Sequence, residues 1–392
     1  MLKLCVLFQM HGSDIEARNE ERQRNIRQAC SSTGTPQPTS FKVENIGHNV
    51  FFENTHGVLF CGIAKVSSTF WTEMLAVLRK GDTYDSPFQL NLSMARKIVP
   101  RFKAVKKAFR KQKLQRMLEI STSFMFTRDP YARLYSGYVN KIYSPNMMYW
   151  KMYGRKIAQT TKVNPSNMSL AYGHDISFRE LIQYLLQLWK DGKRIDNHFR
   201  SMSEQCDPCA MPFDFIGQLE TLKQDAEYLL QTWRSQYSDF KLEFNDFENE
   251  SFVEMSKRRI TVLFKARSAI IKMGYPLHNI FLRLWSDFQI RGFISKQCEY
   301  PFTKSETMNV TENQLVDAVK SALGRRHADG DVKGQRQEAM IQAYRTIPLY
   351  EMEQLQRYVQ KDCQLFGYDE RPQTLFDRRT SPDSNHLYLK GL

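Results

Sequence analysis

Residues 57–78, GVLFCGIAKVSSTFWTEMLAVL, constrain the fold more than any other part of the chain. The short apolar run at 58–60, which lies between two glycines, predicts a buried strand. Apolar side chains at helical spacing predict a helix over 69–78. The turn between them carries Lys65 and a run of hydroxyl groups. Because such a turn exposes the first N–H groups of the helix, it favours a bound anion such as a phosphate group.

A simpler interpretation of the same stretch fits about equally well. Ser68 or Thr69 would then only cap the helix, without any ligand. The loop of nucleotide triphosphatases is disfavoured, because it needs G-x-x-x-x-G-K-[ST]. Here the lysine precedes the hydroxyl groups and the second glycine is missing.

Residues 123–141, SFMFTRDPYARLYSGYVNK, repeat the strand–turn–helix pattern. An aspartate–proline pair follows Arg128 and predicts the start of a helix. Arg128 therefore lies at the carboxyl end of a strand, where open α/β sheets bind ligands, and arginine suits bidentate phosphate binding. Ser136 follows about two helical turns later, and Arg133 adds positive charge. Two such units predict a ligand with two separated anionic groups.

These two stretches together resemble the nucleotide-binding signatures of the Golgi carbohydrate sulfotransferases, in particular the chondroitin, dermatan and N-acetylgalactosamine 4-O-sulfotransferases. The second signature, R-D-P-x-x-R-L-x-S-x-Y-x-x-K, is matched at every fixed position. The first, P-K-V-G-x-T-x-W, is matched except for Ala64 and Ser67. A third stretch, from His198 to FDFIGQLETL, resembles H-W-x-P…C-x-P-C…DFVGKLETL, with Gln218 in place of lysine. The resemblance covers roughly residues 41–370.

Alternating strand–helix units predict an α/β, three-layer, P-loop-like fold. We expect a mainly parallel central sheet flanked by helices, with a helix-rich C-terminal part. The resemblance implies 3′-phosphoadenosine-5′-phosphosulfate (PAPS) as sulfuryl donor and no metal. The residues expected to bind the donor are Lys65, Val66, Ser67, Ser68, Thr69, Phe70, Arg128 and Ser136. Lys65 is also expected to be catalytic, because it would neutralise charge on the leaving group.

Sulfuryl transfer also needs a base for the acceptor hydroxyl, and histidine suits this near neutral pH. Of the eight histidines, His198 is the one in a family motif, so we expect it to be the base. Glu53, Asp175 and Asp196 remain alternatives, and a structural role for His198 also stays open.

The net charge of +14 and the isoelectric point of about 9.3 predict a polyanionic partner. Without a nucleic-acid-binding module or zinc-finger spacing, we expect no nucleic acid. The run at 96–116 is rich in lysine and arginine and has no acidic residue. It predicts either a track for an acidic glycan or only a solvated helix face. We expect an acidic or N-acetylgalactosamine-containing glycan, such as a glycosaminoglycan, as acceptor.

Cysteines and glycosylation sequons bear on the compartment. Seven cysteines are too few for a disulfide scaffold. The pair Cys206-x-x-Cys209 fits half a zinc site, a redox pair or a disulfide, and a disulfide that uses these cysteines, Cys298 or Cys363 is favoured. The N-x-[ST] sequons permit a secretory lumen, and they lie at Asn91, Asn167, Asn249 and Asn309.

The resemblance implies a Golgi membrane glycoprotein with a lumenal catalytic domain and an N-terminal anchor. The first ten residues are apolar but only about half as long as a bilayer requires, so no anchor is visible. We expect a flexible stem and linker at 1–40, the sulfotransferase domain at 41–370 and a polar tail at 371–392. We also expect residues 142–175 to be irregular, with aromatic rings that stack on sugars or fold over the domain.

Two other classes of function stay open. Ala64 and Ser67 alter the loop that would meet the phosphosulfate, so a sulfotransferase-like protein that binds glycans without catalysis is one alternative. A phosphotransferase is the other.

Overall fold

The computed structural model describes residues 2–32, 34, 37–243, 247–326, 332, 334–379 and 386–390. The chain divides into two compact units. The first contains Met1–Arg133, Asp196–Asn245 and Val359–Glu370, and the second contains Leu134–Ile195, Asp246–Tyr358 and Arg371–Leu392.

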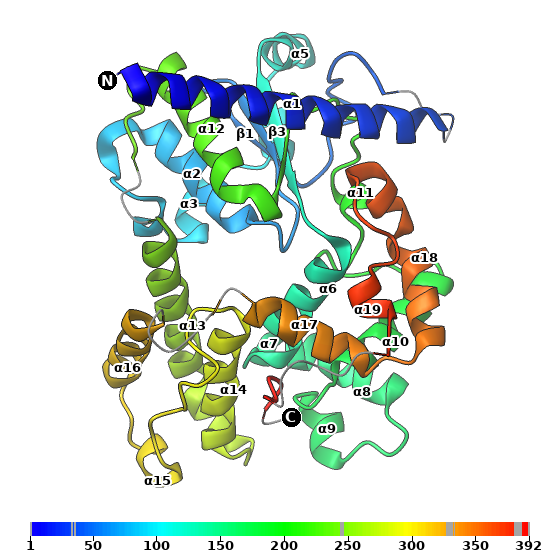
Figure 1. Ribbon diagram of the computed structural model, residues 1–392, viewed down its shortest axis with the longest axis vertical. Helices are drawn as coiled ribbons and strands as arrows, with labels where there is room; N and C mark the ends of the chain where they lie inside the picture. Colours follow the sequence, from blue (N-terminus) through cyan, green and yellow to red (C-terminus); the bar gives the residue numbers. More distant parts are fainter. Residues whose placement is uncertain are drawn as a thin grey trace. The chain divides into compact units, whose positions relative to one another are not determined.

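The first unit is built on a four-stranded sheet in the order β1-β2-β3-β4. Strands β1 and β3 of this sheet are labelled in Figure 1. The strands are β1 (Val50–Glu53), β2 (Val58–Cys61), β3 (Thr122–Thr127) and β4 (Phe215–Gln218). Strands β2, β3 and β4 are parallel, and β1 pairs with β2 antiparallel. The strands are rich in aromatic and β-branched residues and almost entirely buried, as expected of a mainly parallel sheet. The predicted α/β class with a mainly parallel sheet is therefore confirmed.

Helices α2 (Ser68–Lys80) and α12 (Leu222–Gln236) pack against this sheet. The indole of Trp71 on α2 stacks on Phe126 of β3, with ring centroids 4.8 Å apart. Trp233 of α12 meets the same indole edge-on at 6.2 Å. These ring contacts fix α2 on the sheet. Because α2 follows β2 in the chain, its amino end lies near the end of β2, where the candidate site lies.

The first unit also contains shorter helices. These are η1 (Gly81–Thr83), η2 (Pro87–Gln89), α3 (Leu92–Ile98), α4 (Phe102–Ala108), α5 (Lys111–Glu119), α11 (Met202–Gln205) and η5 (Leu219–Thr221). Helices α6 (Pro130–Tyr138) and α18 (Leu349–Phe366) contain residues of both units.

The second unit contains helices and no strand within its described residues. Its helices are η3 (Val139–Tyr143), α7 (Met147–Tyr149), η4 (Trp150–Gly154), α8 (Arg155–Thr161), α9 (Asn167–Tyr172), α10 (Phe178–Lys190), α13 (Phe247–Lys272), α14 (Leu277–Ile290), α15 (Lys304–Thr307), α16 (Glu312–Arg325), α17 (Gln335–Arg345) and α19 (Gln373–Phe376). The expected helix-rich C-terminal part is therefore present.

The expectation of an irregular segment at 142–175 is wrong, because most of it is helical. Its aromatic rings fill the core of the second unit. Trp150 is 1% exposed, and its ring N–H donates to the Ile142 carbonyl at 2.6 Å. The guanidinium of the fully buried Arg283 lies over the rings of Tyr143 and Trp150, at 5.2 and 4.9 Å. These buried rings stabilise a helical segment that the sequence periodicity did not predict.

The division at residues 40 and 370 stays a prediction, and the structure adds three observations. Helix α1 (Leu2–Ser32) packs on β4 and α12, and its Arg22 donates to Asp225 at 2.9 Å. A disulfide joins Cys30 to Cys209. In the expected tail, Phe376 and Tyr388 are buried. Linker residues 33, 35 and 36 lie outside the described residues.

No helix in the described part of the chain is both long enough and apolar enough to cross a membrane.

Candidate active site

The turn between β2 and α2 contains two residues in an unusual backbone conformation. Lys65 has φ of 70° and Ser67 has φ of 51°, in the left-handed region. This region costs residues other than glycine about 1–2 kcal/mol, and such strain is concentrated at functional sites. Ser67 thus adopts the conformation that the glycine of the resembled signature would supply without strain. The turn forms with serine at this position.

The amino end of α2 is not capped by a side chain. Ser67 is the N-cap residue, and its side chain makes no cap hydrogen bond. The interpretation that Ser68 or Thr69 caps the helix is therefore wrong. The first i→i−4 bond runs from the Trp71 N–H to the Ser67 carbonyl at 3.1 Å. The N–H groups of the three residues before Trp71 have no carbonyl one turn earlier in the helix, which is the arrangement that binds anions.

The residues predicted to bind the donor differ in exposure. Val66 is buried in the core, Thr69 is exposed, and Lys65, Ser67 and Ser68 are intermediate. Phe70 is half-buried and packs edge-on against Trp71, with ring centroids 5.1 Å apart. Val66 and Phe70 therefore hold the turn against the core, and the polar residues lie nearer the surface.

The structure brings Arg128 to this turn. Its Nη1 donates to the backbone carbonyl of Lys65 at 3.4 Å, and the side chain is 5% exposed. The reason is topological: β2 and β3 are adjacent and parallel, so their carboxyl ends meet at one edge of the sheet. The two cationic residues predicted from separate motifs thus lie in one cluster.

Arg133 also contacts the turn, although the sequence indicated only an additional charge. It is 2% exposed, and its Nε donates to the Ala64 carbonyl at 3.0 Å. Its Nη2 donates to the Asn197 carbonyl at 3.1 Å. Arg133 therefore links the turn to the segment that carries His198. Asp129 caps its helix by accepting from Ala132 N–H at 2.6 Å, and burial raises the pKa of the Asp129 carboxyl.

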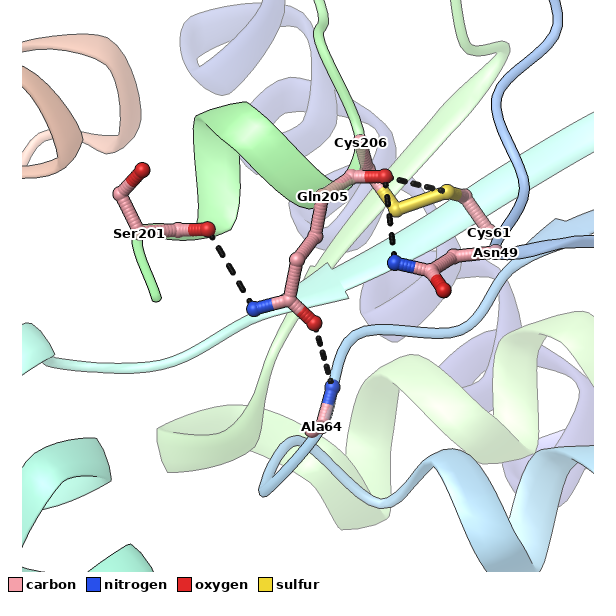
Figure 2. Close-up of a disulfide and its surroundings, with 6 residues drawn as sticks. All are labelled: Asn49, Cys61, Ala64, Ser201, Gln205 and Cys206. Carbon is pink, nitrogen blue, oxygen red and sulfur yellow. Dashed lines mark hydrogen bonds between the residues drawn. A yellow bond between two sulfur atoms is a disulfide. The ribbon is translucent and has the colours of Figure 1, made fainter. Parts of the chain in front are cut away.

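A disulfide and a glutamine hold the turn from another direction (Figure 2). The disulfide joins Cys61, the last residue of β2, to Cys206. Gln205 accepts a hydrogen bond from Ala64 N–H at 3.3 Å and donates to the Arg200 carbonyl at 2.9 Å. The resembled signature has proline at position 64, which lacks an N–H group. The N–H that alanine introduces there is satisfied by Gln205.

The cysteine pairing corrects part of the sequence interpretation. Cys206 pairs with Cys61 and Cys209 with Cys30, so the two cysteines of the C-x-x-C pair do not bond to each other. They form neither half a zinc site nor a redox pair. Neither Cys298 nor Cys363 forms a disulfide with another cysteine in the described part of the chain.

His198 is oriented by Asp196. The carboxylate Oδ1 of Asp196 lies 2.7 Å from His198 Nδ1 and also accepts from the His198 backbone N–H at 2.9 Å. The two side chains are 24% and 17% exposed, so the dyad is reachable from solvent. A carboxylate on Nδ1 favours the tautomer with the proton on that nitrogen, which would make Nε2 the proton acceptor.

The other candidate bases are engaged elsewhere. Glu53 is fully buried and accepts from the backbone N–H groups of Thr55 and His56, at 2.9 and 2.8 Å, which closes a turn. Asp175 lies in the second unit and accepts from the Ser169 hydroxyl at 2.7 Å. Ser136 was predicted to bind the donor and not to act as a base. It also lies in the second unit, on α6, and is 8% exposed.

Within the described residues, no group of three or more histidine, cysteine, aspartate or glutamate side chains could hold a metal ion. What the site offers is a helix amino end, hydroxyl groups, one lysine and a buried arginine. These groups fit a phosphorylated ligand.

A mainly parallel sheet with such groups at its carboxyl edge defines an α/β protein of the P-loop-like class. The chain belongs to the sulfotransferase family, whose sequence model matches residues 48–271. It is 28% identical over 212 residues to carbohydrate sulfotransferase 8 of Mus musculus, which covers 54% of this chain and 50% of that protein. Identity to carbohydrate sulfotransferase 11 of Mus musculus is 28% over 227 residues, covering 57% of this chain and 64% of that protein.

With carbohydrate sulfotransferase 12 of Mus musculus, identity is 27% over 306 residues, covering 69% of this chain and 71% of that protein. The chain spans about half the length of the first relatives, the carbohydrate sulfotransferases 8 and 9. No solved structure matches the chain.

Proposed function

We propose that this protein is a carbohydrate sulfotransferase that moves a sulfuryl group from PAPS to a hydroxyl of an acidic or N-acetylgalactosamine-containing glycan. One observation carries the proposal: the Lys65 turn, the uncapped amino end of α2 and buried Arg128 form one cluster at the carboxyl edge of a parallel sheet. The names of the relatives, all carbohydrate sulfotransferases, support the sulfuryl group and the glycan.

The residues present fit the donor. Lys65 and the hydroxyl and N–H groups of Ser67, Ser68 and Thr69 would hold a phosphosulfate, and Arg128 would hold a phosphate. When bound, PAPS supplies the sulfuryl group and a phosphate leaving group. Lys65 would neutralise the charge that develops on the leaving oxygen, a role worth about 3–4 kcal/mol in the transition state. A role for Ser136 at the 3′-phosphate stays a prediction from the motif.

His198 is the proposed base. Its Nε2 would take the proton of the acceptor hydroxyl while the acceptor oxygen forms a bond to sulfur and the bond from sulfur to the phosphate oxygen breaks. Asp196 holds the ring through Nδ1 and stabilises the imidazolium that results. In this proposal Lys65 and the N–H groups of α2 supply the charge stabilisation, and no metal takes part.

The basic run at 96–116 is the proposed glycan surface. It folds into α3, α4 and α5, which bury Phe102, Leu114 and Leu118. Every lysine and arginine in the run is exposed. An acid-free array of exposed cations repels itself unless an anion binds, so it suits an acidic polysaccharide better than plain solvation.

The proposed compartment is the lumen of the Golgi apparatus, with attachment through an N-terminal anchor inferred from the family. Two disulfides support an oxidising compartment. The four sequon asparagines, Asn91, Asn167, Asn249 and Asn309, are all exposed, which would let them accept glycans.

Ligand-dependent melting and sulfate transfer test the proposal. We expect 3′-phosphoadenosine 5′-phosphate (PAP), the donor product, to raise the melting temperature and ATP to have little effect. Radiolabelled sulfate should pass from PAPS to a desulfated glycosaminoglycan. Lys65→Ala should lower turnover at least about tenfold with the fold intact. Lys272→Ala, an exposed lysine on α13, is the matched control and should behave as wild type.

The same measurements separate the alternatives. Ala64 and Ser67 favour a protein that binds glycans without catalysis. In that case PAP or a glycan would bind without sulfate transfer. Stabilisation by ATP in place of PAP would indicate a phosphotransferase. If neither nucleotide changes the melting temperature, the nucleotide-binding interpretation of the turn is wrong.

A further inference from the structure

The second unit contains a large cavity that shares no residue with the site described above. Its volume is about 710 Å³. One face of α14, the segment at 296–304 and the chain at 386–390 surround it. The lining side chains used here are Trp285, Tyr300, Phe302, Lys296, Lys304 and Lys390.

Three aromatic side chains in the lining, called the aromatic wall below, are held in place. Trp285 is buried, and Tyr300 and Phe302 are half-buried. Tyr300 packs edge-on against Trp285 and Phe302, with ring centroids 5.8 and 5.6 Å apart. The Trp285 ring N–H donates to the Cys298 carbonyl at 2.7 Å. The Tyr300 hydroxyl lies 3.3 Å from the Thr307 hydroxyl. A fixed aromatic surface suits a flat, C–H-rich ligand face, because the ring faces carry partial negative charge.

Positive charge predominates in the rest of the lining. The lining contains three lysines and one carboxylate, Glu299. Lys296 pairs with Glu338 at 2.7 Å, whereas Lys304 and Lys390 are exposed.

Two histidines in the lining respond to this charge. Burial lowers the pKa of His278, and Lys304 lowers it further. Burial also lowers the pKa of His386, and Lys390 and Lys296 lower it further, against an opposing effect of Glu338. Lysine charges thus act on both rings in addition to burial.

We propose that this cavity binds an anionic saccharide, that is, sugar rings that carry carboxylate or sulfate groups. The aromatic wall would contact the C–H face of a ring, Lys304 and Lys390 would meet the charge, and the volume is within the range of ligand pockets. A single inorganic anion would leave the aromatic wall unused. The identification of the saccharide as part of the glycan acceptor depends on the proposed function, and the cavity would then be a second contact for that chain.

Calorimetric titration of the full chain tests this inference. The probe is a 4-sulfated chondroitin tetrasaccharide, and the variant is Lys304→Gln with Lys390→Gln. We expect the dissociation constant to rise about tenfold, since two partly exposed ion pairs are lost. The control, Lys265→Gln with Lys272→Gln, removes two exposed lysines of α13 in the same unit and should bind as wild type. Phe302→Leu should weaken binding roughly threefold by loss of the ring face.

Several outcomes would overturn the inference. One is an unchanged dissociation constant in the Lys304 and Lys390 variant. Another is an equal loss in the control pair, which would show general charge attraction. A third is that PAP binding, and not saccharide binding, is lost in the variant. Failure of the proposed function is distinguishable, since it would appear as absence of a PAP response in the wild type, whatever the saccharide result.

Discussion

At the scale of single residues, the backbone of Ser67 gives the sharpest test of the turn. Its φ of 51° is strained for serine, and glycine removes the strain at the cost of some chain entropy. Ser67→Gly should therefore raise the free energy of unfolding by about 0.5–1 kcal/mol. Chemical denaturation measures this change. Ser68→Gly, at the first position of α2, is the control and should lower stability by about 0.5–1 kcal/mol. A loss of stability in both variants would contradict the turn geometry.

The His198–Asp196 dyad predicts coupled losses of activity. His198→Gln should lower turnover by about 10²-fold or more, and Asp196→Asn by at least about tenfold, because ring orientation is lost. If the two residues act as one unit, the double variant should be little worse than His198→Gln. PAP affinity should be unchanged in all three. Independent, additive losses would indicate that Asp196 does not act through His198.

Asp129 predicts a pH-dependent effect on stability. Burial raises its pKa, so the folded state holds its proton more tightly than the unfolded state does. The stability it contributes is therefore full at pH values below the ordinary pKa of aspartate and declines as pH rises through the raised pKa. Asp129→Asn keeps an N-cap acceptor and removes the half-buried charge. We expect it to raise the melting temperature at pH 7 and to lose this advantage near pH 3.5.

Asp129→Ala provides the comparison. It removes the acceptor for the Ala132 N–H as well as the charge, so the lost cap should cost about 1 kcal/mol at low pH. A lower melting temperature for Asp129→Asn at pH 7 would show that the carboxylate stabilises the fold despite its burial.

The sequence predicted part of this site at the residue scale. Lys65 and Arg128 were found because each lies just after an apolar strand, and adjacent parallel strands bring such positions together. Gln205 and Arg133 could not be assigned, because their roles come from hydrogen bonds to backbone atoms far away in the sequence. No side-chain pattern reports which backbone N–H or carbonyl a residue will meet.

At the scale of elements, short apolar runs were informative and aromatic-rich stretches were not. Strands β2 and β3 follow their predicted runs, whereas β1, in the VFFE run, was not predicted. The helices between 147 and 172 were missed because prolines and glycines break their periodicity. A Cβ atom on Gly154 would lie 2.0 Å from the Gly173 carbonyl oxygen, so this glycine permits close helix packing.

The Cys61–Cys206 disulfide predicts a coupling between elements. It fixes the end of β2 to the chain that carries Gln205, directly before the turn. Replacing both cysteines by serine should lower stability by about 2–5 kcal/mol and weaken PAP binding several-fold. Replacing Cys30 and Cys209 should also lower stability, because that disulfide closes an even longer loop, with a sequence separation of 179 residues against 145, but it should leave PAP affinity unchanged. Equal PAP affinity in both double variants would show that the disulfide does not position the turn.

At the scale of the whole molecule, the sequence indicated one catalytic domain, and the structure divides the chain into two units with separate cores. The core of the first contains the sheet residues and Trp71. The core of the second contains Trp150, Trp285 and the helices around them. The family resemblance runs through both units without marking their boundary, because the chain crosses between them several times. Periodicity is local and cannot report such a division.

The division predicts that two ligands protect different parts of one chain from hydrogen exchange. PAP should slow amide exchange at 62–72 and 124–130 in the first unit, because ligand binding suppresses local opening. The chondroitin tetrasaccharide should slow exchange at 278–304 and 386–390 in the second unit. Lys65→Ala should abolish the first footprint and leave the second, and the Lys304 and Lys390 variant should do the reverse. If PAP protects the cavity segments, or if the saccharide protects only the basic run at 96–116, then the assignment of ligands to units is wrong.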